Sequence, residues 1–422
     1  MSRLRWLWHE LTRPRGPVRH RFYRVGRSSR AGVALLMVVS SIMLLTVIVT
    51  EITYGATVRI SLAAHHRDEA KAEALALSGI QMYRLILMGS QALGRNPMVQ
   101  QFGAMMGVNG DSLWQMLPRF NTGLLRMVFV SGGDLDEDDA EEFRDAGGLT
   151  EEQRDESRED TSGSKRNFLD FDGDFSASVK DENRFIFVGN LQAQDMASLL
   201  QLPATQQLQG LMMREEYNEF FRDHNLDRVE LISNLVDWTD LDSTRVFRGG
   251  QEEQLYDNLD SPYMTKNAPF DTKEEIRLVD GWHLDGVWER FGRHLTIYGN
   301  GKINVNTATR PVLRGLFMAY QDGTSYNDVM MDQFLDLFLE FRGKPLAQGG
   351  IYFQNANGFV SFVENSIGLQ LRDDVTTAIQ TQSETFRVVS TGEVGDARVE
   401  IMAVIDFSNN NKIGRILHYR IR

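Results

Sequence analysis

The densest set of potential ligand groups in the chain is the stretch DWTDLDSTRVFRGGQEEQLY, residues 237–256. Its acidic side chains are Asp237, Asp240, Asp242, Glu252 and Glu253. The first three fall within six residues, and the Gly-Gly turn can bring the last two back toward them. Carboxylate oxygens suit Ca²⁺, which takes roughly six to eight oxygen ligands in flexible geometry. The spacing predicts a calcium site, although a helix C-terminus followed by an Asx turn fits the same residues.

Other candidates for chemistry are weaker. His65 and His66 follow an apolar segment within a helical pattern. At this position we expect solvent-exposed charged side chains around the helix rather than a metal site. The acids of FLDFDGDF lie close to EF-hand spacing, but Gly173 comes after the second Asp instead of the third. The chain has no Gly-x-Ser-x-Gly motif, no phosphate-binding loop and no nucleophile–base pair. We therefore expect no enzyme activity.

The first element of the chain is a predicted helix that contains an uncharged segment between Arg30 and Glu51. Its twenty residues make about 30 Å of helix, enough to cross a bilayer. The preceding leader, residues 1–32, carries nine Arg and one Glu, whereas the whole chain has a net charge of −13. This asymmetry predicts a cytoplasmic leader and an exported acidic body.

The apolar segment differs from a secretory signal peptide, because the small residues Ala31 and Gly32 precede it instead of following it. Beyond Glu51 the helical pattern continues to about residue 93, and Asn96-Pro97 supplies a stop. The sequence predicts one long helix, half in the membrane and half amphipathic outside it.

The composition of the body limits its partners and its compartment. Its acidity argues against nucleic acid, which requires clustered Lys and Arg. The chain has no cysteine, which suits an exported protein that must avoid wrong disulfides.

The rest of the chain alternates between strand and helix patterns. An acidic, low-complexity run at 134–160 reads as a solvated loop. Residues 168–191 predict strands with a turn at residues 181–183, and residues 203–246 predict helices. The tail, residues 383–407, alternates about Gly392–Gly395 and predicts a β-hairpin.

The phrase GKINVNTATRPVL, residues 301–313, predicts a short strand at 302–305 followed by a helix capped by Thr307 or Thr309. It is similar to a helix-hairpin-helix unit, which binds DNA backbone in other proteins. In so acidic a chain we expect a structural helix cap. A DNA-uptake or type IV pilus-related minor pilin remains the alternative, and a basic surface around Arg310 and Arg314 would favour it.

Taken together, the order of pieces resembles the minor pseudopilin K of bacterial type II secretion systems. The resemblance covers residues from about 30 to the end. The motifs that carry it are RAGVALLMVV, EALALSGIQ, GDFSASVKDENRF, VDWTDLD with GGQEEQLY, SPYMTKNAPFDTKEEIRLVDG, GKINVNTATRPVL and the closing hairpin. The long basic leader and the acidic run depart from the family's pattern.

The resemblance implies an α+β fold: a long N-terminal transmembrane and packing helix, a pilin-like antiparallel sheet, and a large helical insertion with two SAM-like subdomains. The implied division is a cleaved leader (1–32), the N-terminal helix (33–96, membrane part about 33–50), the first part of the pilin-like domain (97–200, with the acidic loop 134–160), the helical insertion (201–380, with the calcium-type loop 237–256) and the C-terminal strands (381–422).

The resemblance also implies processing. The family's precursors are cut by the prepilin peptidase after a glycine, which matches Gly32, so that Val33 becomes the N-methylated terminus. The fifth mature residue is Met37, where most pilin-like proteins carry a glutamate thought to pair with a neighbour's terminal amine. A subunit without such a neighbour should lack the buried carboxylate, and only a filament's end has no neighbour.

The function implied is that of a non-enzymatic minor pseudopilin in the inner membrane, single-pass, with its C-terminal domain in the periplasm at the pseudopilus tip. Its implied partners are the I- and J-type minor pseudopilins, the major pseudopilin and the prepilin peptidase. Because the family holds calcium beside the helical insertion, the acids of 237–256 become the expected pool of calcium ligands.

Overall fold

The structure is a computed structural model, and it describes residues 29–94, 113–116, 119–129, 172–323, 327–344, 350–408 and 413–422. The chain forms two compact units, Met1–Ala64 and His65–Arg422. The leader, the predicted stop at residues 96–97 and the acidic loop 134–160 lie outside the described residues.

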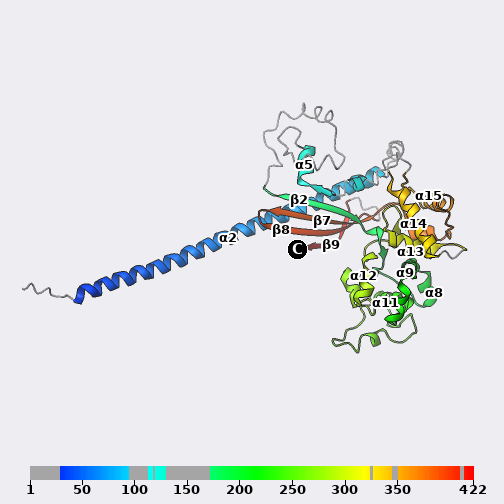
Figure 1. The fold of residues 1–422 in the computed structure, drawn as a ribbon, viewed down its shortest axis with the longest axis horizontal. Coiled ribbons are helices and arrows are strands. Elements are labelled where there is room, and N and C mark those ends of the chain that lie inside the picture. The colour runs from blue at the N-terminus through cyan, green and yellow to red at the C-terminus, as the bar shows by residue number, and fades with distance from the viewer. Residues whose placement is uncertain are drawn as a thin grey trace, which may run out of the picture. The chain divides into compact units, whose positions relative to one another are not determined.

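A single helix, α2 (Ser29–Gly94), confirms the predicted long N-terminal helix (Figure 1). Within the described part of the chain it is the one helix long and apolar enough to cross a membrane, judged by length and composition. Its apolar side chains up to Leu62 are exposed to a large degree. Four threonine hydroxyls donate to the carbonyl oxygen four residues earlier, which satisfies them without water. They are Thr46, Thr50, Thr53 and Thr57.

The second unit is built on an antiparallel five-stranded sheet with the strand order β1-β2-β7-β8-β9. The strands are β1 (Arg119–Asn121), β2 (Asp174–Asp181), β7 (Thr385–Val394), β8 (Ala397–Asp406) and β9 (Arg415–Ile421). Strands β7 and β8 form the predicted C-terminal hairpin, which turns at Gly395 with φ +56°. Two short helices, α4 (Leu113–Met116) and α5 (Thr122–Phe129), accompany β1.

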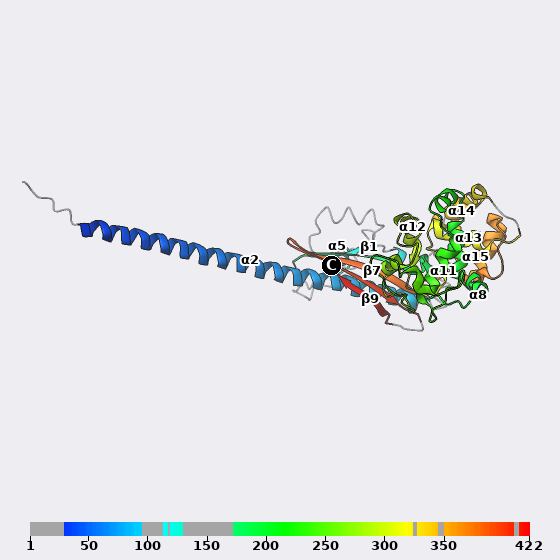
Figure 2. The same ribbon diagram turned by 90° about the horizontal axis from the view of Figure 1, so that it is seen from below.

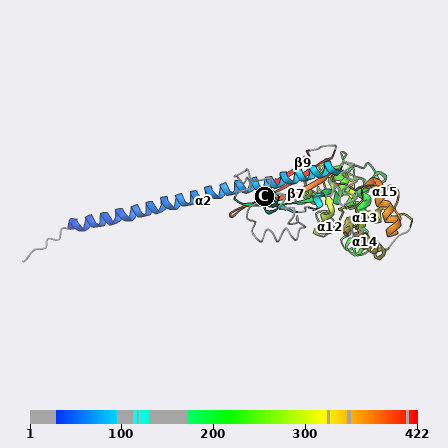
Figure 3. The same cartoon turned by 90° about the horizontal axis from the view of Figure 1, so that it is seen from above.

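The C-terminal part of α2 packs on one face of this sheet, as Figure 3 shows for the helix beside β7 and β9. Its buried residues recur every three or four positions, the spacing of one helix face. They are Ala72, Ala76, Ile80, Tyr83 and Leu87. The helix approaches β7 closely at Gly392, where a Cβ atom would lie 2.0 Å from the carbonyl oxygen of Ala72. Glycine is therefore required there by the helix and not by the hairpin turn.

The helical insertion lies between the paired neighbours β2 and β7, and its helices gather at one end of the sheet (Figures 1 and 2). Its helices are α8 (Met196–Gln201), α9 (Pro203–Met212), α10 (Tyr217–Asp223), α11 (Arg228–Thr239), η3 (Glu252–Leu255), η4 (Lys273–Leu278), α12 (Asp285–Arg290), η5 (Gly292–His294), α13 (Arg310–Tyr320), α14 (Asp328–Gly343), α15 (Ala356–Phe362), η7 (Val363–Ile367) and α16 (Val375–Ala378). The α+β class with a large helical insertion is thus confirmed.

The insertion begins earlier than the sequence predicted. The turn at 181–183 exists, as η2 (Glu182–Arg184), but the next strand, β3 (Ile186–Phe187), does not pair with β2. It pairs in parallel with β4 (Leu295–Thr296) inside the insertion. The boundary placed at residue 200 instead lies directly after β2, because the partner of β3 is far along the chain and no local pattern reveals it.

Helices α9 and α13 cross closely within the insertion's core. A Cβ atom at Gly210 would lie 2.1 Å from the carbonyl oxygen of Gly315. A second parallel pair joins β5 (Ile303–Asn304), in the middle of the insertion, to β6 (Ile379–Gln380), near its C-terminal end. Asn304 of β5 also bonds to Asp181 at the end of β2 and to Ser383 just before β7, so the two ends of the insertion meet at this side chain.

Candidate metal centre

Helix α11 supplies the first two acidic side chains of the candidate site. It begins at the N-cap Asp227, whose carboxylate accepts from the backbone N–H groups of Val229 and Glu230. Asp237 lies in its last turn, and Asp240 is the C-cap, where the backbone leaves the helix in an extended conformation. Both side chains belong to the buried end of a helix that is itself mostly buried.

A tight reversal brings the third acid back to them. The chain turns through Arg248, Gly249 and Gly250, with φ of +66°, +67° and +98°, the left-handed region that favours glycine. The bridge between Thr244 and Gln251 closes this reversal. Glu252 then follows as the first residue of η3 and points into the same site.

The three carboxylates form one buried cluster. Oxygen atoms of Asp237, Asp240 and Glu252 all lie within 4.8 Å of one another. Their side chains are 2%, 3% and 0% exposed. Oδ1 of Asp237 accepts from the N–H of Val246 at 3.0 Å. The other five carboxylate oxygens are buried and accept no hydrogen bond of normal geometry from the residues that the structure describes.

Burial shifts the pKa of each carboxyl upward. It raises the pKa of Asp237 to about 6, of Asp240 to about 7 and of Glu252 to about 8. Repulsion between neighbouring carboxylates adds to each rise, whereas the hydrogen bond from Val246 lowers the pKa of Asp237 and the Thr265 hydroxyl lowers that of Glu252. Without a cation the cluster therefore competes for protons near neutral pH.

Both arginines of the same loop are paired with Glu230, and Nη2 of Arg248 lies 3.7 Å from its Oε2. Nη2 of Arg245 lies 3.0 Å from Oε1 of Glu230, although its charge still lowers the pKa of Asp237. Five buried oxygens without a donor of normal geometry, on three acids with no dedicated positive partner, are costly to bury. The donor set fits a hard divalent cation such as Ca²⁺, for which carboxylate oxygens are preferred ligands.

Two of the five acids in the predicted pool are outside this cluster. Asp242 is exposed and accepts from the N–H of Thr244 at 2.7 Å, which is the Asx turn that the sequence left as an alternative. Its charge nevertheless raises the pKa values of the clustered carboxyls. Glu253, the next residue after Glu252, is half-buried and does not belong to the group of converging oxygens.

One polar residue near the site escaped the sequence reasoning. Asn267 has φ +48°, its amide donates to the carbonyl oxygen of Asp242, and its own Oδ1 is buried without a donor. A neutral carbonyl oxygen is a normal calcium ligand. Asparagine tolerates the left-handed region, so the sequence is compatible with a turn at residue 267. No local pattern, however, connects residue 267 with the loop at 240–242.

The NVNT segment forms a second polar cluster with a structural role. Nδ2 of Asn304 donates to Oδ2 of Asp181 at 3.2 Å and to Oγ of Ser383 at 2.6 Å, and the Thr307 hydroxyl donates to the same Asp181 carboxylate. Burial raises the pKa of Asp181 to about 6. Thr309 is the N-cap of α13, without a side-chain capping bond. These residues join the insertion to the end of β2.

The two arginines that the DNA-binding alternative depends on are engaged by acids of α14. Arg310 pairs with Asp332 and Asp336. Arg314 is 3% exposed and pairs with Asp328. They therefore do not present the basic surface that this alternative requires.

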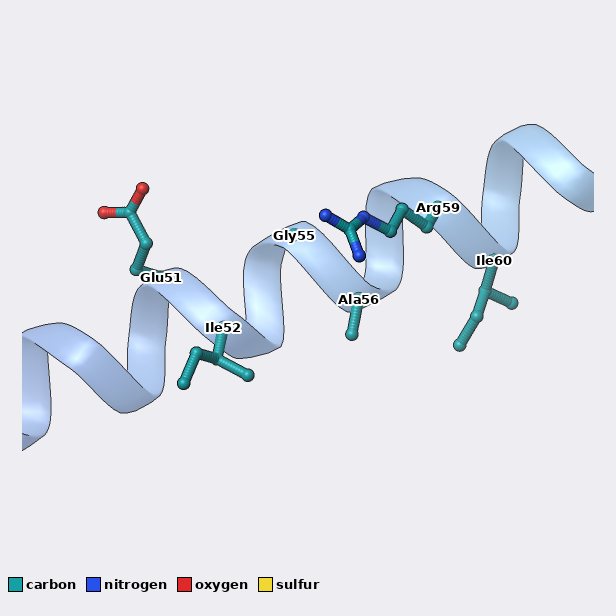
Figure 4. Close-up of a pocket in the computed structure, with 6 residues that line it drawn as sticks. All are labelled: Glu51, Ile52, Gly55, Ala56, Arg59 and Ile60. Carbon is teal, nitrogen blue, oxygen red and sulfur yellow. The ribbon is translucent and has the colours of Figure 1, made fainter.

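An enzyme would need a cleft with paired acids. The depression drawn in Figure 4 lies on the exposed surface of α2 over Gly55, between a ridge of Ile52, Ala56 and Ile60 and the side chains of Glu51 and Arg59. It holds one carboxylate, Glu51, and not the pair of acids by which an enzyme site would be recognised.

The predicted cleavage position lies near the beginning of α2. Gly32 and Val33 are both helical, and Val33 is 52% exposed. Met37, at the position where pilin-like proteins carry a glutamate, is 65% exposed. Cleavage itself stays a prediction.

The structure thus combines a long apolar helix, an antiparallel sheet on which its C-terminal part packs, and a helical insertion that carries the acidic cluster. Residues 190–300 match the family described as "Type II secretion system (T2SS), protein K". The match confirms, over these residues, the resemblance stated from the sequence.

Among solved structures, the chain is similar to a chain of "The Crystal Structure of the GspK-GspI-GspJ complex from enterotoxigenic Escherichia coli Type 2 Secretion System". The identity is 15%, the match covers 60% of this chain and 80% of that chain, and the TM-score is 0.43. No curated protein matches the sequence.

Proposed function

We propose that this chain is the minor pseudopilin at the tip of a type II secretion pseudopilus. It assembles there with I- and J-type minor pseudopilins and nucleates the filament of the major subunit, whose growth drives exported proteins across the outer membrane. The observation that carries the proposal is that the protein K match covers residues 190–300, the segment that holds the buried acidic cluster.

The size of the globular head and the residue at position 37 support the tip position. The insertion between β2 and β7 makes the head much larger than a sheet and a helix alone. Heads of this size would collide if they repeated along a thin filament. Met37 leaves the helix without the carboxylate that would need a neighbour's amine, so the end of the filament is the position that suits it.

The membrane part supports insertion before assembly. The apolar part of α2 anchors the precursor in the inner membrane, with the acidic body in the periplasm. After cleavage behind Gly32 the uncharged first turns from Val33 pack on the helices of two smaller minor pseudopilins.

The acidic cluster is proposed to hold calcium. Asp237, Asp240 and Glu252 would supply carboxylate oxygens, with Oδ1 of Asn267 as a neutral fourth group and Asp242 close enough to add its charge. The ion would neutralise the buried carboxylates and fix the loop between α11 and η3. Its role in this proposal is structural.

The assembly is tested by co-purification. The unit His65–Arg422 should co-purify with the soluble parts of the I- and J-type subunits and not with that of the major subunit alone. In cells, deletion of the gene should impair secretion and change pseudopilus number or length while the major subunit is still made. Tagged protein spaced evenly along the filament would contradict the tip position.

Processing is tested separately. Gly32→Leu should leave the uncut precursor, whereas Gly55→Leu, a matched glycine with nothing within 4 Å of its Cβ position, should still be cut. N-terminal sequencing should find Val33 in the native and Gly55→Leu proteins. A start beyond Thr50 in assembled material would refute the cleavage site.

A further inference from the structure

Strand β9 leaves one edge of the sheet open. It is the last strand in the order β1-β2-β7-β8-β9, and among the described residues no strand pairs with its outer side. Its seven residues are exposed or half-buried. At about 3.4 Å per residue the edge is roughly 23 Å long, a length that natural sheets usually shorten or cover.

The hydrogen bonds at the end of β9 show which backbone groups face outward. Arg422 and Glu400 exchange both bonds, with N···O distances of 2.9 Å and 3.1 Å. In an antiparallel pair such doubly bonded positions alternate with positions whose polar groups point away. Arg420 therefore also bonds to β8, whereas the N–H and C=O groups of Tyr419 and Ile421 point to the open edge.

The side chains of this edge are divided between its two faces. Tyr419 and Ile421 pair with Ala403 and Ile401, both 0% exposed on the α2 face, yet are themselves 42% and 47% exposed. An added strand with apolar residues opposite them would extend that buried face.

The opposite face of the edge is basic. Arg420 and Arg422 alternate with the two apolar residues, and Arg415 lies at the other end of β9. In an otherwise acidic body these last eight residues hold three arginines and no acid. Arg415 and Arg422 reach acids of β8 at 3.3 Å and 4.0 Å, whereas Arg420 has no acidic partner in the part of the chain that the structure describes.

This pattern selects the kind of strand that can pair. A second copy of β9 would place arginine against arginine, which is destabilising, whereas acidic side chains opposite Arg420 and Arg422 are favourable. We propose that β9 is a docking edge that accepts an extended segment of a partner protein as a sixth strand, with acidic residues facing the arginines and apolar residues facing the α2 side. This inference goes beyond the proposed function and does not depend on the calcium site.

The test uses the full chain in detergent and labelled, end-blocked heptapeptides. The probe is Glu-Val-Glu-Val-Glu-Val-Glu, and the comparisons are its lysine counterpart and the same acidic peptide N-methylated at alternate residues. Fluorescence anisotropy should show binding of the acidic peptide alone, because the lysine peptide meets like charge and N-methylation removes the bonding edge. Equal binding of any comparison peptide would overturn the proposal, as would no binding of the probe.

Two variants separate this edge from general attraction between charges. Arg420→Glu should weaken the acidic peptide about fivefold, whereas Arg398→Glu should stay within about twofold. Arg398 is the matched control, because it is a 68% exposed arginine of β8. Circular dichroism melts check that both variants are folded. Equal losses in the two variants would place the attraction elsewhere.

Hydrogen exchange then locates the peptide. On binding, the amides of Tyr419 and Ile421 should become protected, while that of Arg422, already bonded to Glu400, should not change. Protection of Tyr419 and Ile421 in the free protein would overturn the proposal. Protection that increased with protein concentration would show that a second copy covers the edge. Protection independent of protein concentration would show that another part of the same chain covers it.

Discussion

Replacing Asp240 by asparagine tests whether the acidic cluster is a cation site or only a buried group of acids. Without a cation, the pKa of Asp240 is raised from 3.8 to about 7. A shift of this size corresponds to about 4 kcal/mol of unfavourable free energy for the ionised group. Asp240→Asn removes that charge but leaves a buried amide, so we expect the cation-free variant to be about 1–2 kcal/mol more stable than the native unit.

Calcium should reverse this order. At a free concentration about 100 times its dissociation constant, an ion that binds only the folded state adds about 3 kcal/mol. For a unit of this size that corresponds to a rise of about 5 °C in melting temperature. Asp240→Asn should lose most of this gain, since one of the three converging carboxylates is gone. The native unit should therefore be more stable than the Asp240→Asn variant in calcium and less stable than that variant in chelator.

The assay is a set of thermal melts of the unit His65–Arg422 in chelator and in calcium, followed by circular dichroism. Asp257→Asn is the matched control, because Asp257 is an exposed acid of the same region outside the cluster. It should keep the full calcium shift. The reasoning fails if chelation leaves the native melting temperature unchanged, or if Asp240→Asn lowers it equally in both conditions.

Three further outcomes follow from the same structure. The folded-state pKa values of the clustered carboxyls are raised to about 6–8, so their contribution to stability is largest below about pH 4 and is lost as the pH rises through about 6–8. The melting temperature in chelator should therefore fall from pH 6 to 8.5, and this fall should vanish in calcium. A rise of the melting temperature with pH in chelator would contradict this. Gly210→Ala should cost about 1–3 kcal/mol in urea unfolding, because the new Cβ meets the backbone of α13, whereas Gly343→Ala has open space and should not destabilise. Asn304→Ala should cost about 1–3 kcal/mol by the same measurement, since it leaves the buried Asp181 carboxylate with fewer donors; unchanged stability would show that water replaces the amide.

The parts of the fold that the sequence predicted correctly are those decided by local spacing. The apolar stripe of α2 and the alternation in β7 and β8 need only neighbours along the chain, and both elements are where the patterns placed them. The acidic pool also contained the three clustered carboxylates. Which three converge was not predictable, because Asp240 and Asp242 differ only by the direction in which the chain leaves α11.

Contacts between distant positions account for what was missed. Asn304 bonds to Asp181 across 123 positions in the chain, and β3 pairs with β4 although no periodicity connects them. The NVNT segment could be recognised as a helix start. Its hydrogen bonds between the insertion and the sheet could not, because they depend on these distant partners. The boundary of the insertion shifted for the same reason.

The position of the insertion between two paired strands has a consequence for how the chain folds during synthesis. β2 is made long before its partner β7: Ser383, which donates to Asp181, lies 202 positions after it. Closing so long a loop in an unfolded chain costs about 5 kcal/mol.

An insertion that has already folded removes most of this cost, because Asn304 bonds to both Asp181 and Ser383 and so holds the two ends of the insertion together. Oδ1 of Asn183 accepts from the N–H groups of Glu384 and Thr385 at 3.0 Å each, which fixes the register in which β7 begins beside β2. Until β7 to β9 arrive, only β1 and β2 of the sheet are available to cover the apolar face of α2 from Ala72 to Leu87. The last strands to be synthesised therefore decide when this helix stops being a target for aggregation or proteolysis.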